Sequence, residues 1–226
     1  VKDGLFENFP CDVIFGMHNR PGLAVGKFQI RPGAMMAGGA FFDIEIVGVG
    51  AHGARPESGI DPVVVASHIT TALQSIVSRN VRPVDTAVVS VTQIHAGDAY
   101  NVIPQRAVLR GTVRCFSTDT MAMVERRMRQ IAEGVAGGFG ATAALDFRAL
   151  FPPLVNNGDE TDYIAEVAAE LVGPENVNRQ SGPVMASEDF SYMLQCVPGA
   201  YIQIGNGDGE GAVSYTHLRA HETGRN

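Results

Sequence analysis

Two periods of apolar and polar positions run along the chain, and each predicts one kind of element. Between Phe41 and Val49 apolar and polar residues alternate with a period of two, as expected of a strand with one buried face. Between residues 119 and 137 the apolar positions recur every three or four residues: Met121, Val124, Met128, Ile131 and Val135. This spacing predicts an amphipathic helix.

Capping residues place a second helix. Asp61 can cap a helix N-terminus, and Pro62 suits the first helical turn because its missing N–H would have no partner there. A helix is therefore predicted over Val63–Arg79. Ser117 and Thr118 are the corresponding cap candidates for the helix at 119–137.

Three more strand-like runs complete the central part of the chain. Thr86–Ala96 and Val102–Phe116 are predicted strands, and Gly97–Tyr100 joins them as a hairpin or meander turn. Residues 141–150 supply the last strand. The order strand, helix, strand, strand, helix, strand over residues 40–150 is that of a ferredoxin-like sandwich with helices on one face of the sheet.

The two flanks have an α/β pattern of their own. The second flank contains a predicted helix at Thr161–Val172 and an apolar strand at Ala200–Ile204. We therefore predict an α/β domain built from residues 1–33 and 151–212, with residues 34–150 inserted between its halves.

Composition and charge exclude several kinds of partner. The 17 Lys and Arg residues are scattered and the formal net charge is −7, so no nucleic-acid surface is expected. No apolar run reaches the roughly 18 residues that span a bilayer and no signal pattern is seen, so we expect no membrane and a cytoplasmic location. The three distant cysteines, Cys11, Cys115 and Cys196, fit neither a disulfide framework nor a CxxC zinc site. We expect buried free thiols.

Two histidines stand in contexts that suit chemistry. His18 ends an apolar strand beside a Pro/Gly turn, where α/β sheets place ligands; a hydrogen-bonded structural histidine of the loop is the alternative. His52 lies among small residues in GVGAHGARP, where a ligand can approach the ring closely and accept a hydrogen bond from it. An exposed turn histidine is the alternative there.

Polar residues farther along the chain are candidates for substrate binding. Arg114 suits a carboxylate because its planar guanidinium can bind both oxygens; a surface ion pair is the alternative. Asn101 lies thirteen residues earlier, and side chains an odd number of residues apart along an uninterrupted strand point to opposite faces. A bulge or the Ile103–Pro104 turn must therefore intervene if Asn101 and Arg114 serve one site. Glu188 and Asp189 are paired carboxylates that either cap a helix or line a site.

Four segments of the chain together resemble peptidase family M20, in particular its N-acyl-amino-acid amidohydrolases of the hippurate hydrolase and plant auxin-conjugate hydrolase type. The segments are FGMHNRPGLAVG at 15–26, GVGAHGARPESGIDPV at 48–63, NVIPQRAVLRGTVRCF at 101–116 and SEDFSYML at 187–194. They occur in the family's order and at similar spacing, and the likeness extends over residues 1–212.

The resemblance implies a metal-dependent exopeptidase-like catalytic α/β domain and an inserted lid domain that pairs with the lid of a second subunit to form a homodimer. It implies two divalent metals per complete site, zinc, manganese or cobalt, with His18 as a ligand of one. His52 matches the lid histidine that stabilises the tetrahedral oxyanion in the partner's site. Asn101 and Arg114 match lid positions that hold the substrate and its carboxylate, also in trans, and Glu188 matches a substrate-side motif.

The implied reaction is hydrolysis of the amide bond of N-acyl amino acids by a metal-bound water. The family's glutamate base and further ligands lie upstream of VKDGLFENFP, so we expect an N-terminal portion to be missing and this chain to be an inactive fragment. Residues 213–226 depart from the family pattern, and we interpret them as a non-native tail in which His217 and His221 are not ligands. The alternative is a non-catalytic dimerisation or ligand-binding module.

Overall fold

The computed structural model describes residues 1–207, which divide into two compact units. Unit 1 consists of Val1–Met36, Leu154–Val184 and the described residues from Glu188 on. Unit 2 consists of Ala37–Pro153 and Met185–Ser187. The predicted tail at 213–226 lies outside the described residues.

The predicted domain boundaries, 33/34 and 150/151, each lie three residues before the observed ones. At the first boundary unit 1 is longer than predicted, because β3 (Gly33–Met36) pairs as an antiparallel strand with β10 (Leu154–Asn156) of the same unit. At the second boundary unit 1 resumes three residues later than predicted, because β9 (Thr142–Phe151) of unit 2 continues to Phe151.

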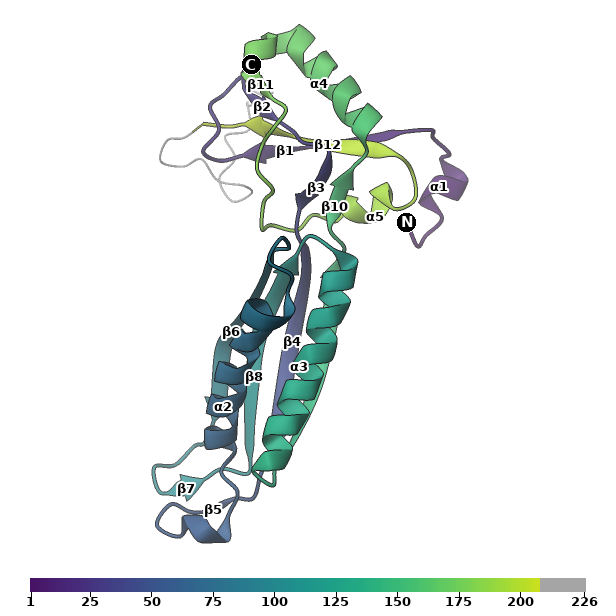
Figure 1. Ribbon diagram of the computed structural model, residues 1–226. Coiled ribbons are helices and arrows are strands. Elements are labelled where there is room, and N and C mark those ends of the chain that lie inside the picture. The colour runs from purple at the N-terminus through teal and green to yellow at the C-terminus, as the bar shows by residue number, and fades with distance from the viewer. Residues whose placement is uncertain (208–226) are drawn as a thin grey trace, which may run out of the picture. The chain divides into compact units, whose positions relative to one another are not determined.

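Unit 2 is an antiparallel four-stranded sheet with two helices on one face (Figure 1). Its main elements are β4 (Gly38–Val47), α2 (Pro62–Ser75), β6 (Ala87–Ala96), β8 (Arg106–Cys115), α3 (Thr118–Gly138) and β9 (Thr142–Phe151). In the sheet the order is β6-β8-β4-β9. The predicted order of strands and helices is the observed one, which is typical of ferredoxin-like sandwiches.

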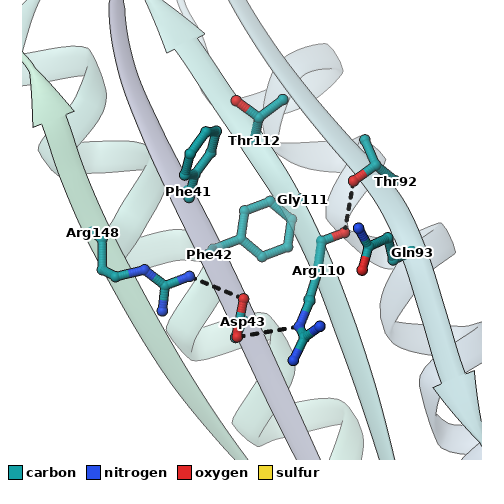
Figure 2. A pocket seen from close by; sticks show the side chains of 9 residues that line it. All are labelled: Phe41, Phe42, Asp43, Thr92, Gln93, Arg110, Gly111, Thr112 and Arg148. Atoms are coloured by element: carbon teal, nitrogen blue, oxygen red, sulfur yellow. Dashed lines mark hydrogen bonds and ion pairs between the residues drawn. The ribbon is translucent and has the colours of Figure 1, made fainter.

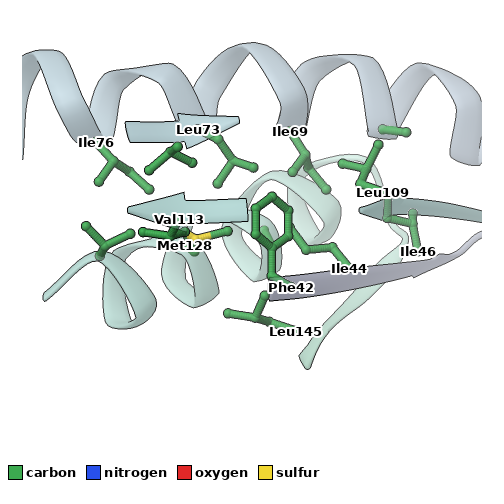
Figure 3. Close-up of a cluster of buried hydrophobic side chains, with 14 of the residues drawn as sticks. Phe42, Ile44, Ile46, Ile69, Leu73, Ile76, Leu109, Val113, Met128 and Leu145 are labelled. Carbon is green, nitrogen blue, oxygen red and sulfur yellow. The ribbon is translucent and has the colours of Figure 1, made fainter. Parts of the chain in front are cut away.

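The core of unit 2 lies between this sheet and the two helices (Figure 3). The period-two pattern of β4 sends Phe42, Ile44 and Ile46 into it, each fully buried, whereas Phe41 is 45% exposed. The facing side chains include Ile69, Leu73, Leu109, Val113 and Met128. Full burial of one large apolar side chain contributes about 1.5–3 kcal/mol, so shifting β4 by one residue would be strongly destabilising.

The predicted caps at Asp61 and Ser117 are confirmed, whereas Thr118 is the first residue of α3. Asp61 Oδ1 accepts a hydrogen bond from Val63 N at 2.8 Å, and Ser117 Oγ accepts one from Thr120 N at 3.4 Å. The helix predicted over Val63–Arg79 begins one residue earlier as α2, and its end is a π-helix, η2 (Ile76–Asn80).

The run predicted as one strand over Val102–Phe116 is two strands. It divides at Pro104 into β7 (Val102–Ile103) and β8, because proline has no N–H to donate to a ladder. β7 pairs with β5 (Ala51–His52), and the 3-10 helix η1 (Pro56–Ser58) follows β5. These short elements form one end of unit 2, which we call the β5–β7 tip.

Unit 1 contains a four-stranded sheet with α4 (Gly158–Val172) on one face. Its order is β1-β12-β2-β11, with bounds Ile14–Arg20, Gly199–Gly205, Phe28–Gln29 and Val177–Asn178. Ala200 and Ile202 of β12 pack with α4, and the alternate residue Tyr201 packs on the opposite side with Met35 and Leu154. The remaining short helices are α1 (Leu5–Asn8), η3 (Pro174–Asn176) and α5 (Phe190–Leu194).

The expectation of three buried thiols is wrong for two of them. All three cysteines are free, but only Cys115 is buried, whereas Cys11 and Cys196 are exposed. Both lie outside the strands and helices, where apolar burial is not required. Burial raises the pKa of the Cys115 thiol. Among the described residues no helix is long and apolar enough to cross a membrane.

Candidate functional site

The five predicted site residues fall in two units. His18 and Glu188 belong to unit 1, and His52, Asn101 and Arg114 belong to unit 2. The two residues of unit 1 share one face of its sheet, whereas those of unit 2 lie at two separate ends.

His18 is a half-buried residue of β1, not a loop residue. Its Nδ1 lies 2.7 Å from the carbonyl oxygen of Asn19. A carbonyl can only accept, so in the neutral ring Nδ1 carries the proton and Nε2 keeps its lone pair. Metal-binding histidines use this arrangement, in which the second ring nitrogen donates to a backbone carbonyl.

The register of β1 with β12 places His18 on the face of the sheet opposite α4. Gly16 is paired with Tyr201 and His18 with Gln203, so these side-chain positions alternate away from the helix. A Cβ at Gly16 would lie 2.8 Å from the Tyr201 ring. His18 therefore lies on the same face as Tyr201, about 7 Å farther along the strand direction.

Glu188 is held on that face by Tyr201. The Tyr201 hydroxyl donates to Glu188 Oε2 at 2.6 Å, and the tyrosine is almost fully buried. Burial raises the Tyr201 pKa well above its ordinary value, and the hydrogen bond to Glu188 adds to the effect. Helix capping by the carboxylate pair is not observed, because Asp189 occupies the N-cap position of α5 without a side-chain capping hydrogen bond. Tyr201 thus holds the carboxylate of Glu188 in a fixed position.

His52 and Asn101 are brought together at the β5–β7 tip. Gly53 N donates to the Asn101 carbonyl at 2.7 Å, and Ala54 N donates to His52 Nδ1 at 3.1 Å. Because Nδ1 accepts, the neutral ring carries its proton on Nε2, which is then a donor. His52 lines a pocket of about 700 Å³ at this tip, so it can offer a hydrogen bond to an oxygen bound there.

Arg114 does not join them: within one chain the Ile103–Pro104 turn does not bring Asn101 and Arg114 to one site. Arg114 is near the far end of β8, eight residues from Arg106, which lines the tip pocket. At about 3.3 Å per residue the separation is roughly 26 Å. Pro104 does divide the strand, but Asn101 and Arg114 still lie beyond opposite ends of the segment from β7 to Val113.

Arg114 is half-buried and has a neutral partner. Its Nη1 donates to Ser187 Oγ, and its register partner on β4 is Gly39. None of the ion pairs found within residues 1–207 includes it. The surface ion pair considered for this residue is therefore not formed there.

The residues described fit a metal only in part. His18 has the tautomer that a ligand needs, and Glu188 offers carboxylate oxygen on the same face of the sheet. Across residues 1–207 there is, however, no group of three or more His, Cys, Asp and Glu side chains that could hold a metal ion. His18 can supply one ligand, and the described part of the chain does not supply a complete set.

A second pocket, of about 500 Å³, lies on the open face of the unit 2 sheet (Figure 2). Asp43 lies there between two guanidinium groups, 3.0 Å from Arg148 and 3.4 Å from Arg110. Arg148 also pairs with Asp146. Because these charges compensate one another, we assign no ligand to this pocket, and no predicted site residue lines it.

Three partners of the site residues were not singled out from the sequence. Ser187 stands inside a recognised segment, but nothing local connects it to Arg114, which is 73 positions away. Tyr201 reads as one apolar residue of a buried strand. Ala54 acts through its backbone N–H, which no side-chain pattern can reveal.

Comparison with known proteins gives a consistent result. Residues 1–222 match peptidase family M20/M25/M40. The chain is similar to hippurate hydrolase of Campylobacter jejuni, with 39% identity over 206 residues that cover 91% of this chain and 54% of that protein. It is also similar to N-acetylcysteine deacetylase of Bacillus subtilis, with 40% identity over 192 residues that cover 85% and 50%.

Among solved structures, the YXEP protein of Bacillus subtilis, described as a dinuclear metal binding peptidase from the M20 family, superposes with a TM-score of 0.74. Its sequence is 33% identical, and the match covers 92% of this chain and 52% of that one. The chain thus spans about half the length of the curated relatives it matches.

Proposed function

The chain belongs to peptidase family M20/M25/M40, and on that premise we propose that the protein containing it hydrolyses the amide bond of N-acyl amino acids. Its relatives include a hippurate hydrolase and an N-acetylcysteine deacetylase, both named for removing an acyl group from an amino acid. We use "full-length protein" for the gene product that contains this chain with any sequence encoded around it.

The observation that carries the proposal is that the backbone holds His18 and His52 as opposite tautomers. His18 keeps a free Nε2 lone pair, suited to a divalent metal such as zinc, manganese or cobalt. His52 keeps an Nε2–H, suited to the oxygen that becomes negative when a carbonyl is attacked. A bound divalent metal would polarise that carbonyl and lower the pKa of a bound water.

The remaining residues of the proposed site bind substrate. Arg114 offers an uncompensated charge to the amino-acid carboxylate. Asn101, hydrogen-bonded through its carbonyl to Gly53, holds the substrate beside His52. Glu188, held by Tyr201, lies on the face of unit 1 that carries His18 and is proposed to bind substrate there.

We propose that unit 2 is a lid through which two copies pair. His52 lies at the β5–β7 tip, and Arg114 lies roughly 26 Å along β8 from Arg106, which lines the pocket at that tip. One lid therefore cannot bring His52 and Arg114 to one small substrate. A second copy can supply His52 and Asn101 in trans. The family resemblance implies that Arg114 also acts in trans; because Arg114 lies at the other end of β8 from the tip pocket, we propose instead that it serves its own subunit. β6 is an edge strand of this sheet, with exposed Ile94, and offers unpaired backbone for such a contact.

Metal content and activity test the catalytic proposal. The 226-residue chain and the full-length protein are analysed for bound metal and assayed on an N-acyl amino acid. We expect about two metals per subunit and amide hydrolysis for the full-length protein alone. If the full-length protein binds no metal and leaves the amide intact, the non-catalytic binding module replaces the enzyme.

Mixing two inactive variants of the full-length protein tests the shared site. In a dimer of His52→Ala with Arg114→Ala subunits, one site keeps its own Arg114 and receives an intact His52 from the partner. Random pairing makes half of the dimers mixed, so about a quarter of the wild-type activity should return. No recovery after subunit exchange would contradict the assignment of His52 in trans with Arg114 in cis.

A further inference from the structure

Arg114 occupies a niche in unit 2 that one glycine makes possible. Gly39 on β4 is its register partner, and a Cβ at this position would lie 2.7 Å from Ser187 Oγ and still closer to Arg114 Nη1. The missing side chain at Gly39 is therefore what leaves room for the contact between Arg114 and Ser187.

The partner of Arg114 differs from those of the other arginines on the same strand. Arg106 and Arg110 of β8 each pair with a carboxylate of β4, Glu45 and Asp43 respectively. Arg114 instead donates to a neutral hydroxyl. A hydroxyl fixes the position of the guanidinium without neutralising it, so the charge stays available for a second anion.

We propose that Ser187 is a positioning residue, and Gly39 a specificity-determining one, for recognition of the substrate carboxylate by Arg114. This inference rests on the proposed function, because it assigns the carboxylate of an N-acyl amino acid to Arg114. A free arginine side chain loses rotamer entropy when it is ordered. Ser187 orders the side chain before substrate arrives, and that lowers the cost of binding.

Ser187→Ala in the full-length protein tests the positioning role. Binding an unordered side chain costs about 0.5–1.5 kcal/mol more, so KM for an N-acyl amino acid should rise roughly twofold to tenfold with kcat unchanged. KM for the matching N-acyl amino-acid amide, which lacks the carboxylate, should not change. Ser187→Thr keeps the hydroxyl and should restore the wild-type KM.

Gly39→Ala tests the niche from the other side. The atoms that an added Cβ would meet are the ends of two flexible side chains, so the fold should tolerate the methyl group while Arg114 and Ser187 move apart. We expect the same rise in KM for the carboxylate substrate alone. Unchanged thermal unfolding of both variants shows that the fold is intact.

Arg114→Ala separates failure of this inference from failure of the proposed function. If Arg114→Ala leaves KM unchanged, the carboxylate assignment itself is wrong. If Arg114→Ala raises KM but neither Ser187→Ala nor Gly39→Ala does, the positioning role is overturned while the carboxylate assignment stands. An equal effect on the carboxylate and amide substrates would show a structural role and also overturn the inference.

Discussion

His18 in unit 1 and His52 in unit 2 both lie in strands, yet the backbone holds their rings in opposite forms. The Asn19 carbonyl, 2.7 Å from His18 Nδ1, requires a proton on that nitrogen. The Ala54 N–H, 3.1 Å from His52 Nδ1, requires a lone pair there. Nε2 is therefore an acceptor in His18 and a donor in His52. The backbone group at Nδ1 therefore decides whether Nε2 of a histidine suits a metal or an oxyanion.

The largest expected effect is on the stability of unit 2, which carries His52. Phe42→Ala empties a fully buried position of unit 2 and should cost about 3–5 kcal/mol, measured by urea unfolding. Phe41→Ala is the matched control, because this neighbour is 45% exposed and faces away from the core. Because unit 1 has its own apolar clusters, the His18 resonances should keep their native shifts while unit 2 unfolds. Equal costs for the two variants would contradict the assigned faces of β4.

The next effect separates the two histidines in the full-length protein. His52→Ala should lower kcat by roughly 10²–10³ through lost oxyanion stabilisation, with metal content unchanged. His18→Ala should instead lower metal content, measured by elemental analysis. Metal loss in His52→Ala, or full metal content in His18→Ala, would contradict the different roles assigned to the two histidines.

Arg114→Ala sharpens the comparison within unit 2, because Arg114 lies at the end of the sheet far from His52. Loss of a charge-assisted hydrogen bond costs about 1.5–3 kcal/mol, so KM for carboxylate substrates should rise roughly tenfold to a hundredfold. Arg110→Ala on the same strand is the control, since Arg110 pairs with Asp43 and should leave KM unchanged. A comparable rise in the control would reject a specific role.

Tyr201→Phe probes the face of unit 1 that carries His18. It removes the hydrogen bond to Glu188, at a cost on the order of 1 kcal/mol near neutral pH. The Tyr201 pKa is raised in the folded state, so the folded state holds the phenolic proton more tightly than the unfolded state does. This stabilisation is fully present below the unfolded pKa of about 10 and is lost as pH rises above it. The stability difference between wild type and Tyr201→Phe should therefore be constant from pH 7 to 9 and shrink above pH ~10, as urea unfolding at each pH would reveal. A difference that grows at high pH would contradict the assigned direction.

The smallest effect comes from removing the backbone donor to His52. Ala54→Pro deletes the N–H, a hydrogen bond worth about 0.5–1.5 kcal/mol, and should lower kcat about twofold to tenfold, whereas Ala54→Ser keeps the N–H and should not.

Long-range ¹H–¹⁵N spectra of the 226-residue chain test the comparison without any variant. They should show a protonated Nε2 in His52 and a protonated Nδ1 in His18. The same tautomer in both residues would disprove the contrast from which these predictions start.

Much of the fold was accessible from the sequence because its signals are local. The alternation in β4, the apolar spacing in α3 and the caps at Asp61 and Ser117 each involve residues within one element or one turn. Errors arose where a local pattern had a tertiary competitor. Unit 1 extends beyond its predicted boundary at residue 33 because β3 pairs with β10, 118 or more positions away in the chain. Cys11 and Cys196, both expected to be buried, are exposed.

The sequence by itself determined the main strands and helices of unit 2, their order, and which five residues are candidates for the site, because periodicity, caps and motifs are properties of neighbouring positions. Only the tertiary structure decided how those candidates group. It placed Glu188 against Tyr201, gave Arg114 the hydroxyl of Ser187, and separated Arg114 from Asn101 by most of the length of β8. The physical reason is that a partner supplied by a distant segment depends on strand pairing and burial, which no single stretch of sequence contains.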